Sequence, residues 1–157
     1  MDSYLWLKLV HVLSATVLMG TGCGIAFFMW VAARADNPQV IAHTTRYVVL
    51  ADWLFTAPAV IIQAGSGVLL MKLLGFSFQA PWFSAVSALF LFVGLCWLPV
   101  VVIQYKLRTE AKQALQQGRL SERFKQLMRL WLALGMPAFA AMLILFWLMI
   151  FKPLSVV

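Results

Sequence analysis

The residue with the greatest capacity for chemistry is His11, which lies inside a long apolar run. Residues 9–33 carry no formal charge, and a helix that spans a bilayer needs about 20 predominantly apolar residues. An imidazole about two turns inside such a helix needs a hydrogen-bond partner, a metal ion or a haem iron, because an unsatisfied polar group in hydrocarbon is costly. His11 is therefore the first candidate ligand in the chain.

Other residues share the helical face of His11 or lie at its depth. Lys8 is one turn nearer the end of the run, and Ser14 and Gly22 follow on the same face. Small residues below His11 leave room for a flat ring or a neighbouring backbone, and Lys8 is placed to meet haem propionates. Gln63, in the second apolar run, is a candidate hydrogen-bond partner of His11. These five residues form the predicted cofactor site.

Three interpretations of His11 stay open at this point. It is the axial ligand of a b-type haem or porphyrin, the ligand of a copper ion, or a packing histidine held by hydrogen bonds. His43 is not expected to be a second haem ligand, because about 20 residues, or ~30 Å, separate His11 from the inner end of its helix. Eight methionines and two cysteines supply soft ligands for Cu(I), but they form no MxxxM or CxxC motif.

A carboxylate also falls inside an apolar run. Asp52 begins a polar stripe along the second run, with steps of three and four residues. The stripe consists of Asp52, Thr56, Ala59, Gln63, Ser66 and Gly67. Asp52 should face the bundle interior, paired or protonated, and Arg46 and Arg129 lie at a similar depth. We therefore expect a polar cluster of Arg46, Asp52 and Arg129, which is either a structural ion pair or part of a proton relay or ligand site.

Composition and hydropathy place the chain among membrane proteins. Of its 157 residues, 64% are hydrophobic and 11% are charged, whereas a soluble domain is nearer to half apolar and a quarter charged. Four runs are long enough to cross a bilayer, at about 5–33, 47–71, 82–105 and 130–151. We expect an all-α polytopic membrane protein, an antiparallel bundle of four transmembrane helices that forms one domain over residues 1–157.

The connections between these runs carry start and stop signals for helices. Asn37 is a typical N-cap and Pro38 a typical first helical residue. Gly118 is typical of a helix end and Ser121 of a helix start. The segment 106–129 should therefore form two helical extensions joined by a turn near residues 117–120, outside the membrane.

The distribution of basic residues predicts the orientation. The hairpin 106–129 holds seven basic residues, and with Arg34 and Arg46 the first and third connections hold nine of the twelve. The positive-inside rule places these connections in the cytoplasm and both termini on the periplasmic side. Because this topology accounts for the net charge of +7, no nucleic-acid partner is expected, and the hairpin should touch anionic headgroups.

Four segments of the chain are distinctive. They are LWLKLVHVL at 5–13, ADWLFT at 51–56, WLPVV at 97–101 and GMPAF at 135–139. Together they resemble a family of predicted bacterial integral membrane proteins that carry a domain of unknown function. This resemblance spans nearly the whole chain and implies a multi-pass protein of the bacterial inner membrane.

A shorter resemblance is confined mainly to the first helix. The spacing of Lys8 and His11 is similar to that in HemJ-type protoporphyrinogen oxidases, whose first-helix histidine is associated with haem binding. It is also similar to that in CopD-type copper-resistance membrane proteins. The resemblance implies that His11 is a haem ligand, and it assigns no role to Asp52, Arg46 or Gln63.

From these observations we expect a protein that binds haem b or a porphyrin and takes part in electron transfer or porphyrin oxidation. Any catalysis would be that of a haem-dependent oxidoreductase with an unidentified redox partner. The alternatives are a copper-handling membrane protein and a non-catalytic subunit of a larger membrane complex. The expected partners are the lipid bilayer and a second copy of the chain, through the glycine-rich first helix (Gly20, Gly22 and Gly24).

Overall fold

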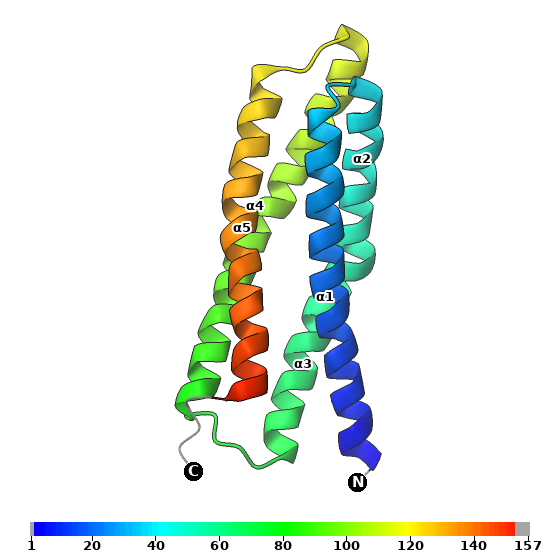
Figure 1. Ribbon diagram of the computed structural model, residues 1–157. Helices are drawn as coiled ribbons and strands as arrows, with labels where there is room; N and C mark the ends of the chain where they lie inside the picture. Colours follow the sequence, from blue (N-terminus) through cyan, green and yellow to red (C-terminus); the bar gives the residue numbers. More distant parts are fainter. Residues whose placement is uncertain (1, 153–157) are drawn as a thin grey trace.

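The computed structural model describes residues 2–152, and within them the chain is helical with no strand (Figure 1). The elements in chain order are α1 (Asp2–Arg34), α2 (Pro38–Ala51), η1 (Asp52–Thr56), α3 (Ala57–Leu73), α4 (Pro81–Gln117) and α5 (Glu122–Phe151). α2, η1 and α3 follow one another without a break, so the described chain has four helices long and apolar enough to cross a membrane. The prediction of an all-α polytopic membrane protein is confirmed.

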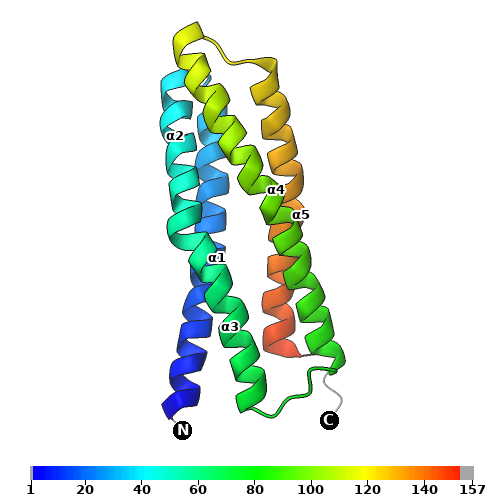
Figure 2. The same ribbon diagram turned by 180° about the vertical axis from the view of Figure 1, so that it is seen from behind.

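The four spans run antiparallel. The connections after α1 and after α4 lie at one end, and both ends of the chain lie at the other, with the connection between α3 and α4 (Figure 1). α1 packs on α2 and α3, α2 packs on α4, and α4 packs on α5. Both views show α4 beside α2 at the hairpin end and set apart from the second span at the other end (Figures 1 and 2). The larger hydrophobic core therefore lies at the hairpin end, around Ile41, Leu107 and Phe124.

The predicted helix boundaries are confirmed at three positions. The Asn37 side chain accepts hydrogen bonds from the N–H groups of Gln39 and Val40 at the start of α2. Gly118 ends α4 with a φ of 71°, a left-handed conformation that glycine adopts without steric cost. The Ser121 side chain caps α5 by accepting from the Phe124 N–H.

The second span contains a wide turn just before Pro58. In η1, a π-helical turn, the Ala57 N–H donates to the Asp52 carbonyl, five residues earlier. Proline has no N–H, and its ring crowds the carbonyl four residues before it, so a wider turn relieves the crowding. The wider turn also alters the rotation between Asp52 and the residues after it. Asp52 consequently lies against α4, whereas Gln63 and Ser66 lie against α1.

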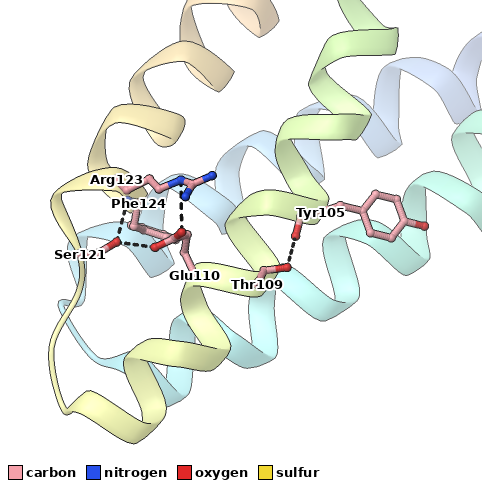
Figure 3. A network of polar contacts seen from close by, with 6 residues as sticks. All are labelled: Tyr105, Thr109, Glu110, Ser121, Arg123 and Phe124. Atoms are coloured by element: carbon pink, nitrogen blue, oxygen red, sulfur yellow. Dashed lines mark hydrogen bonds and ion pairs between the residues drawn. The ribbon is translucent and has the colours of Figure 1, made fainter.

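One carboxylate organises the basic hairpin between α4 and α5 (Figure 3). Glu110 accepts a hydrogen bond of 2.6 Å from the Ser121 hydroxyl and forms an ion pair of 3.4 Å with Arg123. The same Ser121 oxygen accepts from the Phe124 N–H at 3.0 Å. The N-cap of α5 is thereby tied to the side of α4, which fixes the angle at which the two helices meet.

Large apolar side chains cover the outside of the spans. Ile61 is 73% exposed, Met136 70% and Ile150 72%. In water such a surface would be unfavourable, but a bilayer solvates it. The exposed apolar surface therefore agrees with the lengths of the helices: the protein sits in a lipid bilayer.

Replacing Ser121 by alanine should weaken the hairpin. The change removes the N-cap of α5 and the hydroxyl that donates to Glu110, so we expect the free energy of unfolding to fall by about 1 kcal/mol. Unfolding by SDS in mixed micelles measures it. Ser87→Ala, on an exposed position of α4, is the control and should change little. Equal effects of the two substitutions would contradict the role of Ser121.

Candidate functional site

His11 joins α1 to α3 through both of its ring nitrogens. Nδ1 lies 2.8 Å from the Ser66 hydroxyl, and Nε2 lies 3.0 Å from Nε2 of the Gln63 side-chain amide. The Ser14 hydroxyl reaches Gln63 Oε1 at 2.5 Å. We call His11, Ser14, Gln63 and Ser66 the His11 cluster. The sequence expectation that Gln63 would bond to His11 is confirmed.

Each hydrogen bond of the His11 ring can be assigned a donor and an acceptor. Because the amide nitrogen donates to Nε2, the ring carries its proton on Nδ1 and donates it to Ser66 Oγ. Ser66 in turn donates to the Ile62 carbonyl at 2.6 Å. On the other side of the ring, a Cβ at Gly67 would lie 3.3 Å from His11 Cε1. Gly67 therefore gives the ring the space it needs to lie against α3.

Two of the predicted cofactor residues lie outside this cluster. Lys8 is exposed, and its ammonium lies 5.7 Å from the centre of the Tyr4 ring. Gly22 is eleven residues, or about 16 Å, farther along α1, and no heavy atom comes within 4 Å of a Cβ built there. The structure thus brings together His11, Ser14 and Gln63 and leaves Lys8 and Gly22 apart. The homodimer through α1 stays a prediction.

The described arrangement does not offer haem iron or copper an open ligand at His11. An axial ligand must present a free nitrogen lone pair, but Nε2 accepts from Gln63 and Nδ1 donates to Ser66. No group of three or more histidine, cysteine or acidic side chains within residues 2–152 is placed to hold a metal ion. Haem or copper at His11, and the redox partner that haem implies, stay predictions that require Gln63 or Ser66 to leave the ring.

A second polar cluster lies deeper in the bundle, around Asp52. Asp52 is 5% exposed, and its carboxyl faces Thr56 from the same turn and Trp97 and Gln104 from α4. We call these four residues the Asp52 cluster. The neighbouring Trp53 donates to the Tyr105 hydroxyl at 2.8 Å, which holds η1 against α4.

The Asp52 cluster contains polar atoms that are buried but have no hydrogen bond within 3.5 Å. They are Asp52 Oδ2, Thr56 Oγ1, Trp97 Nε1 and Gln104 Oε1. Trp131 Nε1 is also unpaired, and its side chain lines the same small space in the core as Gln104. Such an atom costs about 1–3 kcal/mol, and more than nine in ten buried polar groups in proteins are paired. Because these atoms surround a buried carboxyl, the Asp52 cluster is a second candidate functional site.

The expected cluster of Arg46, Asp52 and Arg129 is not formed. Both arginines are exposed, and neither forms an ion pair with Asp52 in the described part of the chain. Arg46 precedes Asp52 by six residues, so it lies roughly 120° around the helix. Long arginine side chains near the end of a span extend to the interface, where the charge is solvated.

Two partners of Asp52 on α4, and a tryptophan of α5 that lies near one of them, were not predicted from the sequence. Trp97, Gln104 and Trp131 were not among the candidates. Gln104 had one signal. It is the one residue with a side-chain amide in the third apolar run, near the charged end of that run. The indoles had none, because tryptophan in a span is usually an apolar or interfacial residue.

The match to known sequences covers nearly the same residues as the helical bundle. Residues 5–153 match the family described as "Predicted integral membrane protein (DUF2269)". The chain belongs to this family. Neither a search of the curated proteins nor a search of the solved structures found a match. Membership of the family confirms the longer of the two resemblances, whereas no match supports the similarity to HemJ-type or CopD-type proteins.

Two glycines on α3 give a matched test of the space beside His11. A Cβ at Gly65 meets nothing within 4 Å, so Gly65→Ala should raise the free energy of unfolding by up to about 1 kcal/mol through helix propensity. Gly67→Ala should lose that gain or reverse it, because hydrogen bonds hold the ring that its Cβ would contact. SDS unfolding measures both variants. Equal stabilisation would show that His11 moves aside freely.

An absorption spectrum tests the fit of haem at His11. From the paired ring nitrogens we expect no Soret band in detergent-purified protein from haem-replete cells. Copper analysis of the same sample tests the other metal. A Soret band, or stoichiometric copper, that is present in the wild type and lost in His11→Ala would contradict this expectation and would mean that Gln63 or Ser66 releases the ring.

Proposed function

We propose that the protein transfers protons within the membrane and that Asp52 is the group that binds and releases them. The observation that carries the proposal is a carboxyl buried at bilayer depth that forms no ion pair with any residue in 2–152. An ionised carboxylate in such a place is expensive unless it is paired or hydrogen-bonded. An acidic residue kept at such a position indicates a functional group in a membrane protein.

The neighbours of Asp52 suit both of its protonation states. When the carboxyl is ionised, the Trp97 N–H and the Thr56 hydroxyl are donors that face it. When it is protonated, it becomes a donor itself, and the unpaired Gln104 Oε1 is an acceptor. A site that can satisfy both states favours exchange, since neither state is left without partners.

The wide turn at η1 supports the same function. π-helical turns occur frequently at functional sites in helices. Pro58 leaves a backbone carbonyl of the preceding turn without its donor, and such groups in a membrane must be satisfied by neighbours or water. The turn that carries Asp52 therefore combines a titratable side chain with backbone that water can hydrate.

The proposal also includes the orientation of the bundle and the membrane in which it lies. The hairpin end of the bundle carries most of the basic residues, including Arg119, Arg123 and Lys125. We infer that this end faces the cytoplasm of a bacterial cell and that both termini lie on the periplasmic side of the inner membrane. Protons would then enter or leave the Asp52 cluster from the end at which the bundle is most tightly packed.

Proton flux into vesicles tests the function. Reconstituted protein should acidify vesicles that hold a pH-sensitive dye when a potassium diffusion potential is applied. Asp52→Asn should lower the flux about tenfold or more, because the amide has nearly the same shape but cannot exchange a proton. Asp36→Asn is the matched control: Asp36 lies in the exposed first connection with a φ of 48°, a conformation that asparagine tolerates.

Two results decide the outcome. An infrared band of a protonated carboxyl that is present in the wild type and absent in Asp52→Asn would support the assignment of the proton. Equal flux in wild type and in a folded Asp52→Asn variant, with circular dichroism and elution profile as checks of folding, would overturn the proposal.

A further inference from the structure

The hydrogen bonds of the His11 cluster suit two protonation states of the ring, which packing alone does not require. Its heavy atoms accommodate a neutral and a charged imidazole in nearly the same positions. The difference between the two states lies in the amide of Gln63, whose oxygen and nitrogen can exchange places by rotation about the last side-chain bond.

In the neutral state every step of the chain is assigned. Ser14 donates to Gln63 Oε1 in a short hydrogen bond of 2.5 Å, at the lower limit for O–H···O. The amide nitrogen donates to His11 Nε2 at 3.0 Å. Nδ1 donates to Ser66 Oγ at 2.8 Å.

A proton on Nε2 reverses one half of this chain. The protonated ring donates from Nε2, so the amide must turn and present Oε1 to it. The amide nitrogen then donates to Ser14 Oγ, with that contact lengthening by a few tenths of an ångström to an N–H···O distance. The Ser14 hydroxyl turns to the His11 carbonyl, which already lies 2.9 Å away. The bond from Nδ1 to Ser66 is unchanged.

The charged groups near the ring are few. On α1, Lys8 is one turn nearer the terminus and is exposed, and Asp2 starts the helix. On α3, the one charged side chain is Lys72, at the outer end. On α4 and α5, residues 81–105 and 130–151 carry no charge, and Lys152 at the end of α5 lies over the Phe76 and Trp82 rings. No carboxylate faces His11, so the charged ring depends on the Gln63 oxygen and the Ser66 oxygen.

The ring lies near an open groove at the end of the bundle. His11 is half-buried. An open groove lies between the start of α1 and the end of α3, lined by Ser3, Leu7, Leu69 and Lys72. Leu7 is one turn from His11 and Leu69 one turn from Ser66, so the groove ends about one turn from the ring.

We propose that His11 is a second proton-binding site, in which rotation of the Gln63 amide stabilises the charged imidazole as well as the neutral one. The site lies in the half of the membrane that carries the termini, away from Asp52. It stands on its own hydrogen bonds and does not depend on the function proposed for Asp52.

Nitrogen NMR of the full chain in lipid nanodiscs tests this proposal. His43→Gln, at an exposed position, leaves His11 as the one histidine and serves as the reference protein. We expect the His11 ring to gain a proton on Nε2 as the pH falls from 9 to 4. The Gln63 side-chain amide should change its shift at the same midpoint, because its partner changes from a ring acceptor to a ring donor.

Variants of Gln63 make the test specific. In the reference protein, Gln63→Leu should lower the affinity of His11 for its proton about tenfold, since an unpaired charged donor costs more than an unpaired neutral acceptor. Gln79→Leu, on the exposed connection before α4, is the matched control and should leave the midpoint unchanged. If Gln63→Leu fails to fold, the reference protein still decides the question through the shared midpoint.

Three results would overturn the proposal. They are a His11 ring that stays neutral over the whole pH range, a Gln63 amide that does not respond when the ring is protonated, and a midpoint that Gln63→Leu leaves unchanged. Because the NMR signals report on His11 directly, they separate this proposal from the vesicle experiment. A protein with no proton flux can still show the coupled titration, and a protein with flux can lack it.

Discussion

The absence of water inside the bilayer is the constraint on which this structure depends. Every polar group within a span must find its partner in the protein, and the two intramembrane clusters meet this demand differently. The His11 cluster pairs both ring nitrogens within one helix pair, α1 and α3. The Asp52 cluster leaves buried oxygen and nitrogen atoms unpaired between η1 and α4. The first therefore joins two helices through a ring whose nitrogens are both paired, and the second leaves a buried carboxyl among neighbours that are incompletely paired.

Pro58 lies between these two clusters on the second span. The sequence places Asp52, Thr56, Gln63 and Ser66 on one stripe of a regular helix. The wide turn before the proline changes the rotation within that stripe, so its two halves contact different helices. Along this one span, the proline thus lies between a cluster whose polar atoms are hydrogen-bonded and a cluster in which several polar atoms are not. On the same span, α2 before the turn lies beside α4, whereas α3 after it is set apart from α4 (Figures 1 and 2).

The two ends of the bundle are built differently, and this bears on both proposals. The hairpin end is closed by the larger hydrophobic core and by the contacts of Glu110 with Ser121 and Arg123. At the other end an open groove between α1 and α3 comes within about one helical turn of His11. Proton access is therefore easier to explain for His11 than for Asp52. A path from Asp52 requires water or movement at the π-helical turn.

The sequence by itself determined the fold class, the four spans and most helix boundaries, because these follow from local signals. Runs of apolar residues are dictated by bilayer thickness, and Asn37, Gly118 and Ser121 act on the backbone beside them. It also pointed to His11, Gln63 and Asp52, since a polar residue in an apolar run is conspicuous. Only the tertiary structure decided their partners. Whether Asp52 meets an arginine or Gln104, and whether His11 keeps a free nitrogen, depends on rotation between helices far apart in the chain, and no local pattern encodes that rotation.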